Sequence, residues 1–307
     1  MSVLNIAMFG SDELAKEIAK ATDQRDVHTY VHKEADADGP RILSIIRPAK
    51  FPERLRPFLN ALSAAVVGMV EITKIDATLG EVVVAFASAG IDKGLVIINP
   101  PQGEWVDEDQ VKMIFKQAGL GNWSFEGNDG IDLRAKLYGL MDQVSADLKA
   151  IQQAPLVLPI DQHFNVKGIG LVAIGYVQSG TVNVHDDLVL LPANGTGNAK
   201  SLQVMDDDVP AAVAGDRVGL ALRNAKEDHL GSGTILVRPA IEDKKSGISL
   251  PLAVVQHNAS KMTLIRSPFQ KRDLAVGDII HASADLQFVV GRIESIDGAD
   301  SVVNWES

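Results

Sequence analysis

The sequence predicts an α/β domain followed by all-β structure, and three observations predict it. Residues 1–153 alternate short apolar runs with amphipathic segments, a pattern typical of a parallel sheet with helices on both faces. Residues 154–239 alternate apolar and polar positions between Gly, Asn and Asp clusters, which is typical of a small antiparallel β-barrel. Residues 240–307 contain further strand-like runs. We therefore expect three domains with these boundaries.

The first domain begins with an apolar strand over 3–9 that ends at Gly10. Ser11 is the expected cap of a helix over 12–21, because its hydroxyl can accept a bond from a free N–H. The acids Asp12 and Glu13 suit the positive end of the helix dipole. The other predicted strands are 28–31, 41–46, 65–72 and 94–98, and the other predicted helices are 53–64, 80–90, 107–118 and 131–151.

The two C-terminal domains are predicted from period-2 strands and turn residues. In the second, Gly168 and Gly170 mark a bend or bulge, and Gly180 marks a turn between strands over 170–174 and 181–184. In the third, strands are expected over 252–255, 261–265 and 287–290, with a turn at 276–280. This domain has 69 residues, so we expect a trimmed barrel without a catalytic group.

Composition excludes several classes of protein. No run of 18 apolar residues is present, so we expect no membrane partner. The N-terminus lacks the basic and apolar segments of an export signal, which predicts a cytoplasmic protein. The absence of cysteine excludes a disulfide framework and a thiolate metal site.

The charge opposes strong nucleic-acid binding. The net charge is −11, and basic and acidic residues number 16 and 22 over 1–154, 6 and 9 over 155–238, and 7 and 9 over 239–307. Phosphate neutralisation supplies most of the affinity of nucleic-acid-binding proteins, which usually show a basic domain or stripe. We therefore expect no DNA partner, and an RNA partner would need a local basic patch, which the sequence does not reveal.

Two other groups of residues contain side chains that can bind metals. His28 and His32 lie in a strand-like run, which would put them about 13 Å apart on one side, too far for one ion. The acids at 34, 36 and 38 and the triplet Asp206–Asp208 are predicted to be solvated loops. No metal site is therefore predicted.

Five blocks within residues 155–238 carry a resemblance to a known family. They are Phe164–Gly170, Gly175–Val182, Asp187–Pro192, Ser201–Val204 and Val213–Leu220. In this order and spacing they resemble the second domain of translational GTPases of the elongation factor Tu and elongation factor 1-alpha group, and within it the selenocysteine-specific elongation factors. The resemblance implies a doubly wound, P-loop GTPase-like α/β domain followed by two β-barrels.

The phosphate-binding loop implied by this resemblance is degenerate. A P-loop needs G-x-x-x-x-G-K-[ST], because backbone N–H groups cradle the phosphates, the lysine reaches their oxygens and the hydroxyl ligates magnesium. Here the junction after the first strand runs from Gly10 to Lys16, with one glycine and the acids Asp12 and Glu13. Two carboxylates beside a triphosphate are repulsive. Lys16 is expected to be a solvated helix residue.

The remaining nucleotide motifs are also degenerate. The family's Asp-x-x-Gly turn falls on residues 46–50, which contain neither residue. The guanine-reading Asn-Lys-x-Asp motif retains Asn99 but has Gln102 in place of the carboxylate, and an amide cannot form that charge-assisted pair. The Ser-Ala turn survives in part as residues 123–125. We predict no bound cofactor and no GTPase activity.

The resemblance also suggests where a ligand would bind. In active elongation factors the second domain helps to hold the aminoacyl end of a charged tRNA, and the matching surface here runs along 175–180 and 219–224. Gln178 and Arg223 are the candidate contact residues, although Arg223 could instead clamp a turn. We therefore expect a non-hydrolysing pseudo-GTPase that binds tRNA, the ribosome or another translation factor. The alternatives are a GTPase with an atypical loop and a structural scaffold without RNA contact.

Overall fold

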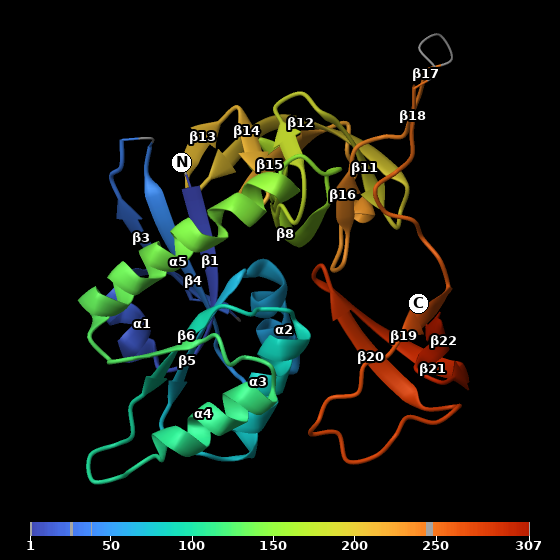
Figure 1. Cartoon of the computed structure of the whole chain (residues 1–307). Coiled ribbons are helices and arrows are strands. Elements are labelled where there is room, and N and C mark those ends of the chain that lie inside the picture. The colour runs from blue at the N-terminus through green and yellow to red at the C-terminus, as the bar shows by residue number, and fades with distance from the viewer. Residues whose placement is uncertain (1, 25–26, 38, 244–247, 307) are drawn as a thin grey trace. The chain divides into compact units, whose positions relative to one another are not determined.

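The computed structural model of the chain describes residues 2–24, 27–37, 39–243 and 248–306. The chain divides into two compact units, one formed by residues 1–146 with 266–273 and the other by residues 147–265 with 274–307. Figure 1 shows the mixed α/β structure of the first unit and the β-strands of the second. The predicted fold class, α/β followed by all-β, is confirmed.

The first unit is built on one sheet with helices on it. The sheet order is β2 (Lys20–Gln24), β3 (Val27–Glu34), β4 (Arg41–Pro48), β1 (Ser2–Phe9), β5 (Val67–Ile72), β6 (Gly94–Ile98) and β7 (Ser124–Glu126). Strands from β4 to β7 are parallel, whereas β2 and β3 are antiparallel to their neighbours. The helices are α1 (Asp12–Ile18), α2 (Leu55–Ala64), α3 (Ala77–Ser88), α4 (Glu108–Gln117) and α5 (Gly130–Ile151). All predicted strands and helices of this domain are present.

Two local predictions for this unit were wrong. The first helix ends at Ile18 rather than at residue 21, because Ala19 is extended and Lys20 begins β2, which pairs with β3. Residues 123–125 are not a turn, because Ser124 opens β7. Trp123 is instead a core residue that packs between Phe86 and Phe115.

Gly68 makes room for that tryptophan. A β-carbon on Gly68 would lie 2.1 Å from the Trp123 ring, closer than side-chain atoms can approach. Trp123 Nε1 donates to Ile91 O at 3.2 Å, which satisfies the polar atom of the buried indole. The strand β5 can therefore lie close to the indole only because it has a glycine at this position.

The second unit begins with the predicted barrel. Its strands run in the order β11 (Asp187–Leu191), β16 (Ile235–Val237), β8 (Leu158–Val166), β9 (Gly170–Tyr176), β15 (Arg217–Arg223), β12 (Gly195–Val204) and β13 (Asp207–Val209). A further pairing of β11 with β12 closes the sheet. The short strands β10 (Thr181–Asn183) and β14 (Ala211–Val213) pair separately.

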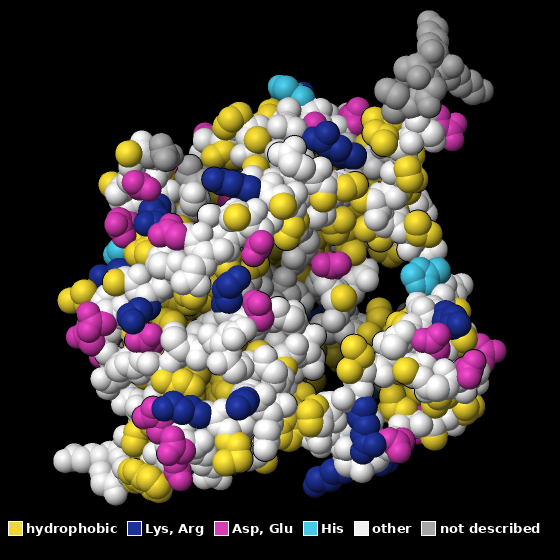
Figure 2. Space-filling model, in the orientation of Figure 1, with side chains coloured by type: hydrophobic (Ala, Val, Ile, Leu, Met, Phe, Trp, Pro, Cys, Tyr) yellow, Lys and Arg dark blue, Asp and Glu magenta, His cyan; other side chains and the backbone are white. Residues whose placement is uncertain are grey.

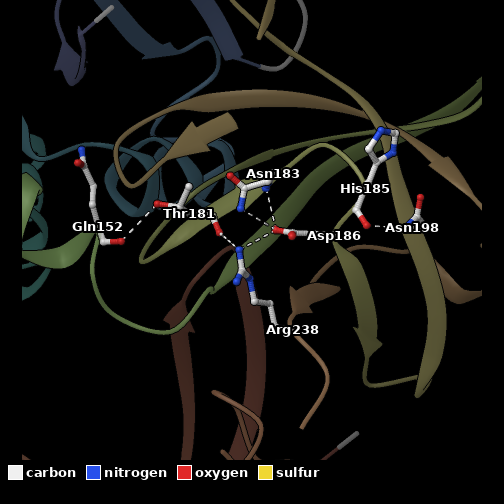
Figure 3. Close-up of polar contacts among 7 residues, drawn as sticks. All are labelled: Gln152, Thr181, Asn183, His185, Asp186, Asn198 and Arg238. Carbon is white, nitrogen blue, oxygen red and sulfur yellow. Dashed lines mark hydrogen bonds and ion pairs between the residues drawn. The ribbon is translucent and has the colours of Figure 1, made fainter. Parts of the chain in front are cut away.

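Polar contacts hold the β10–β11 turn of this barrel (Figure 3). Asp186 Oδ2 accepts bonds from the Asn183 backbone N–H at 2.8 Å and from Arg238 Nη2 at 2.7 Å. His185 lies at φ 76°, and its carbonyl accepts a bond from Asn198 Nδ2 at 2.8 Å. Because these groups bond to one another, we assign this cluster a structural role.

The third predicted domain differs from a barrel. Its strands β19 (Ala259–Thr263), β22 (Asp300–Glu306), β21 (Gln287–Asp297) and β20 (Ile279–Ala284) form a sheet whose pairings among the described residues leave it open. A hairpin of β17 (Ile241–Asp243) and β18 (Ile248–Leu250) precedes it. The predicted strand over 252–255 is irregular, because Leu252 and Val254 pack against the barrel residues Leu191, Ile235 and Val237 instead of pairing.

The two histidines of β3 do not meet in the folded chain. His28 and His32 lie on β3 as predicted, and His32 Nδ1 is 2.8 Å from Tyr138 Oη. Burial lowers the pKa of His32 below its usual value. No cluster of three or more potential metal ligands occurs among the described residues, and no described helix is long and apolar enough to span a membrane.

Candidate functional sites at the sheet edge and on the barrel

The first candidate site lies where parallel strands β1, β4, β5 and β6 end. In open α/β sheets, ligands bind outside the carboxyl ends of the strands. Four residues meet there: Gly10 follows β1, Arg47 is near the end of β4, Glu71 is near the end of β5 and Asn99 follows β6. A network of hydrogen bonds connects Arg47, Glu71 and Asn99 to the loop between β1 and α1.

The connection from β1 to α1 is short. Phe9 ends β1 and Asp12 begins α1, so that only Gly10 and Ser11 lie between them. Ser11 caps the helix as predicted, since its hydroxyl accepts a bond from the Leu14 N–H at 3.1 Å. The connection between β1 and α1 is therefore two residues long.

Glu71 occupies the space beside this connection. Its side chain is buried, with 5% of the residue exposed. One carboxylate oxygen accepts a bond from the Ser11 backbone N–H at 2.6 Å, and the other accepts a bond from Asn99 Nδ2 at 2.7 Å. A β-carbon at Gly10 would lie 2.9 Å from the Glu71 Cβ, so glycine is required for this close contact. The Glu71 carboxylate thus accepts a hydrogen bond from an N–H group at the N-terminus of α1. In other proteins, such N–H groups bind anions.

The surrounding groups complete the network. Asn99 Oδ1 accepts a bond from Asn128 Nδ2 at 3.2 Å, so both ends of the Asn99 amide have partners within the chain. The Gly10 carbonyl accepts a bond from Arg47 Nε at 2.6 Å. Arg47 stands within the segment 46–50, where the sequence places the degenerate Asp-x-x-Gly turn, and its side chain supports the loop from β1.

Lys16 is not part of this network. It forms an ion pair with Asp12 on the surface of α1, and 56% of its side chain is exposed. Tyr30 Oη also donates to Asp12. The bonds from Lys16 and Tyr30 hold the pKa of Asp12 below its usual value. The structure therefore brings together Gly10 and Asn99 but leaves Lys16 as the solvated residue that we expected.

Sequence reasoning missed Glu71 as a site residue. It lies within the predicted buried strand over 65–72. The available signal was one acidic residue within the apolar run Val67–Ile72. A buried carboxylate needs partners, because an unpaired charge in the interior is costly.

The second candidate site, on the barrel, does not unite Gln178 and Arg223. Strands β9 and β15 are antiparallel, with Arg217 opposite Tyr176 and Leu222 opposite Leu171. Gln178 therefore lies beyond one end of this pair and Arg223 lies at the other. Six residues of extended chain separate Arg217 from Arg223, which corresponds to about 20 Å. One small ligand cannot contact both side chains.

The Gln178 end contains two unsatisfied polar atoms. Gln162 Oε1 and Arg217 Nε are buried and have no hydrogen-bond partner among the described residues. The Arg217 guanidinium lies 6.0 Å from the centre of the Tyr176 ring. Gln162 pairs with Ile174, two residues before Tyr176 on β9, so these side chains share one face of the sheet. Buried groups without partners are rare in folded proteins and suggest an unfilled contact.

The Arg223 end gathers basic side chains. Lys167 is in the β8–β9 turn, Lys200 donates from β12 to Ile169 O in that turn at 3.2 Å, and Lys226 follows Arg223 by three residues. Lys167, Arg223 and Lys226 are exposed. We call Lys167, Lys200, Arg223 and Lys226 the hairpin patch. It holds four of the six basic residues between 155 and 238, with acids Glu227 and Asp228 beside it.

On the face that Figure 2 draws, acidic and basic side chains lie among apolar ones. The hairpin patch is a local group of basic side chains on a chain whose net charge is −11. Proteins that bind RNA use such local positive surfaces, because phosphate neutralisation supplies affinity.

Asp216 gives the barrel a pH-dependent stability. It is 7% exposed, and its carboxylate accepts a bond from the Val213 N–H at 2.8 Å. Burial raises the pKa of Asp216 to about 6, whereas the Val213 bond opposes this rise. The Asp216 carboxylate therefore binds a proton more tightly in the folded state than in the unfolded state. The stability that this protonation contributes is present at low pH and is lost as the pH rises through about 6.

We expect Asp216→Asn to remove this dependence. The amide oxygen can still accept the Val213 bond but carries no charge to desolvate. At pH 8 the variant should be more stable than the native chain, on the order of 1–3 kcal/mol. The difference should shrink as the pH falls toward about 4. Urea unfolding at several pH values checks this, and parallel stability profiles for the two proteins would refute it.

Comparisons with known proteins agree with this architecture. Residues 170–237 match the family elongation factor Tu domain 2. The protein MJ0325 of Methanocaldococcus jannaschii is 32% identical over 77% of this chain and 72% of its own length. The selenocysteine-specific elongation factor of the same organism is 32% identical over 58% of this chain and 39% of its own. Elongation factor 1-alpha of Methanospirillum hungatei is 29% identical over 39% of this chain and 28% of its own.

Solved structures show the same fold. The crystal structure of a bacterial selenocysteine-specific elongation factor, EF-Sec, covers the whole chain with a TM-score of 0.79 at 20% identity. The elongation factor SelB of Methanococcus maripaludis, in complex with the GTP analogue GppNHp, does so with a TM-score of 0.71 at 18% identity. This chain spans 54% of the first protein and 73% of the second.

The α/β domain and the closed barrel, together with these matches, define a protein that is similar to translation elongation factors. The chain belongs to one family with the protein MJ0325, its residues 170–237 match elongation factor Tu domain 2, and it is similar to the selenocysteine-specific elongation factors. The predicted resemblance is confirmed.

Proposed function

We propose that this chain is a non-hydrolysing relative of the translational GTPases, which acts by binding tRNA, the ribosome or another translation factor. The observation that carries this proposal is the buried Glu71 carboxylate, which bonds to the Ser11 N–H and to Asn99. Those two groups stand where a nucleotide-binding member of the family would use the loop after β1 and the asparagine after β6. On this proposal, the Glu71 carboxylate takes the place of a bound nucleotide.

The charge at this edge of the sheet opposes a nucleotide. A triphosphate next to Ser11 would meet Glu71 and Asp12, and repulsion between anions in a partly buried site is strong. The Lys16 ammonium, the only basic group on α1, is engaged by Asp12. A nucleotide would therefore have to displace Glu71 from two hydrogen bonds and would gain no lysine in return.

Titration with a fluorescent guanine nucleotide and magnesium tests this account. We expect no saturable signal at roughly 100 µM, a concentration at which a site with a Kd of 1 µM would be almost full. A purified translational GTPase serves as the positive control. Saturable micromolar binding would refute the proposal in favour of a GTPase with an atypical phosphate loop.

The barrel supports the binding role. The hairpin patch offers positive charge to phosphates. A relative of this chain is named as a selenocysteine-specific elongation factor, a protein of the translation apparatus. We therefore favour RNA of that apparatus as the partner over the alternative of a scaffold without RNA contact.

Retention on immobilised tRNA and on ribosomes at increasing salt tests the binding role. Binding through a phosphate-contacting patch should weaken steeply with salt, since each contact releases bound counterions. Retention that is lost between low and moderate salt is the expected result. Absence of retention at any salt would favour the scaffold.

A further inference from the structure

A tryptophan on the first unit is exposed to solvent without an assigned role. Trp105 lies in the connection between β6 and α4, and 80% of its surface is exposed. Trp123, by contrast, is 4% exposed in the core of the same unit. A large aromatic side chain at the surface loses the free energy that its burial would provide. Its exposure therefore needs an explanation outside the core.

The residues around Trp105 are anchored. The Glu104 N–H donates to Pro101 O at 2.9 Å, and Val106 is buried, with 8% exposed. The Asp107 carboxylate then accepts bonds from the Asp109 and Gln110 N–H groups at 3.0 and 3.2 Å and caps α4. The backbone on both sides of the indole is thus held in place. A ring presented in this manner has little entropy to lose on binding.

The side chains near the Trp105 ring are mostly acidic, which indicates the charge of a binding partner. Residues 102–110 read QGEWVDEDQ, with four acids and no basic residue. Glu108 pairs with Lys112 at 2.6 Å, which leaves Glu104, Asp107 and Asp109 as the acids without a lysine or arginine partner among the described ion pairs. Met113, one turn beyond Asp109 on α4, is 56% exposed and adds apolar surface. Acidic side chains repel RNA phosphates and attract a cationic protein surface. Tryptophan is also among the residues that most often dominate protein–protein interfaces.

We propose that Glu104–Asp109 together with Met113, the acidic Trp loop, docks on a basic protein surface that receives the Trp105 indole in an apolar pocket. This inference goes beyond the proposed RNA-binding role and does not depend on it, since the hairpin patch belongs to the other unit. The chain would then have two interaction surfaces of opposite charge.

The probe for the test is a synthetic amphipathic helical peptide of Lys and Leu, added to the whole chain carrying Trp305→Phe. Trp105 is then the exposed reporter, because Trp123 is buried. We expect the emission to move to shorter wavelength and acrylamide quenching to weaken as the peptide binds. Calorimetry should show roughly tenfold weaker binding for Trp105→Ala, the loss typical of an interface anchor. Glu104→Lys with Asp109→Lys should abolish it.

Two controls keep the test specific. Leu55→Ala, at a 49% exposed position on α2, should bind the Lys–Leu peptide like the native chain. A peptide of Glu and Leu and a polyuridylate RNA should leave the Trp105 emission unchanged. Equal binding of the Lys–Leu peptide by the native chain and Trp105→Ala would overturn the proposal, as would a Trp105 response to the acidic peptide or the RNA. Because the Trp105 side chain is exposed, the Trp105→Ala variant should unfold at the same urea concentration as the native chain.

Discussion

Replacing Glu71 with alanine should lower the free energy of unfolding by about 3 kcal/mol, because two part-buried donors lose their acceptor at once. Those donors are the Ser11 N–H at the start of α1 and the Asn99 side-chain amide at the end of β6. The loss of side-chain volume at a residue that is 5% exposed adds a cavity. Urea unfolding of the whole chain, followed by circular dichroism, measures the change.

The matched control is Glu81→Ala, which removes an exposed glutamate from α3 and should change stability by less than about 0.5 kcal/mol. Glu71→Gln separates charge from shape. Its amide offers one oxygen and one NH2 group, so it can accept from Ser11 or Asn99 but not from both. We expect an intermediate loss of stability. Equal stability of Glu71→Ala and the native chain would show that the carboxylate does not organise this sheet edge.

Reversing the charge of Lys167 and Arg223 together should weaken binding to tRNA or ribosomes by roughly 100-fold at low salt, since two attractive phosphate contacts become repulsive. Both side chains are exposed on the hairpin patch, so the barrel should remain folded. The dependence of the affinity on salt should also become shallower. Filter binding over a series of salt concentrations measures both quantities.

A second pair of reversals controls for the total charge. Lys116→Glu with Lys149→Glu changes the net charge by the same amount at exposed helix positions outside the patch. This control should bind RNA nearly as well as the native chain. If both double variants lose the same affinity, the total charge rather than the hairpin patch governs binding. If neither loses affinity, the patch is not an RNA contact.

The fold class could be predicted from the sequence because local patterns determine it. Strands buried on both faces give apolar runs such as 94–98, and helices between them show one apolar side. The closed barrel follows from period-2 strands ended by residues that accept positive φ, such as Gly168, Gly170 and Gly180. These signals lie within a few residues of each other along the chain.

The prediction failed where a distant segment decides local structure. Lys20 continues a helical pattern, yet it begins β2 because the β3 strand offers an unpaired edge. The strand predicted over 252–255 is irregular because its apolar side chains find a place on the barrel surface at Leu191 and Ile235.

The sequence by itself determined the resemblance to elongation factors, the α/β and barrel architecture, and the residues present from Gly10 to Lys16, because these depend on residue types in local order. Only the tertiary structure decided which residues lie next to that segment. It brings Glu71 from β5 to the start of α1, separates Gln178 from Arg223, and gathers Lys167, Lys200 and Arg223 into one patch. These relationships depend on strand order and register, which join residues that lie tens of positions apart in the chain.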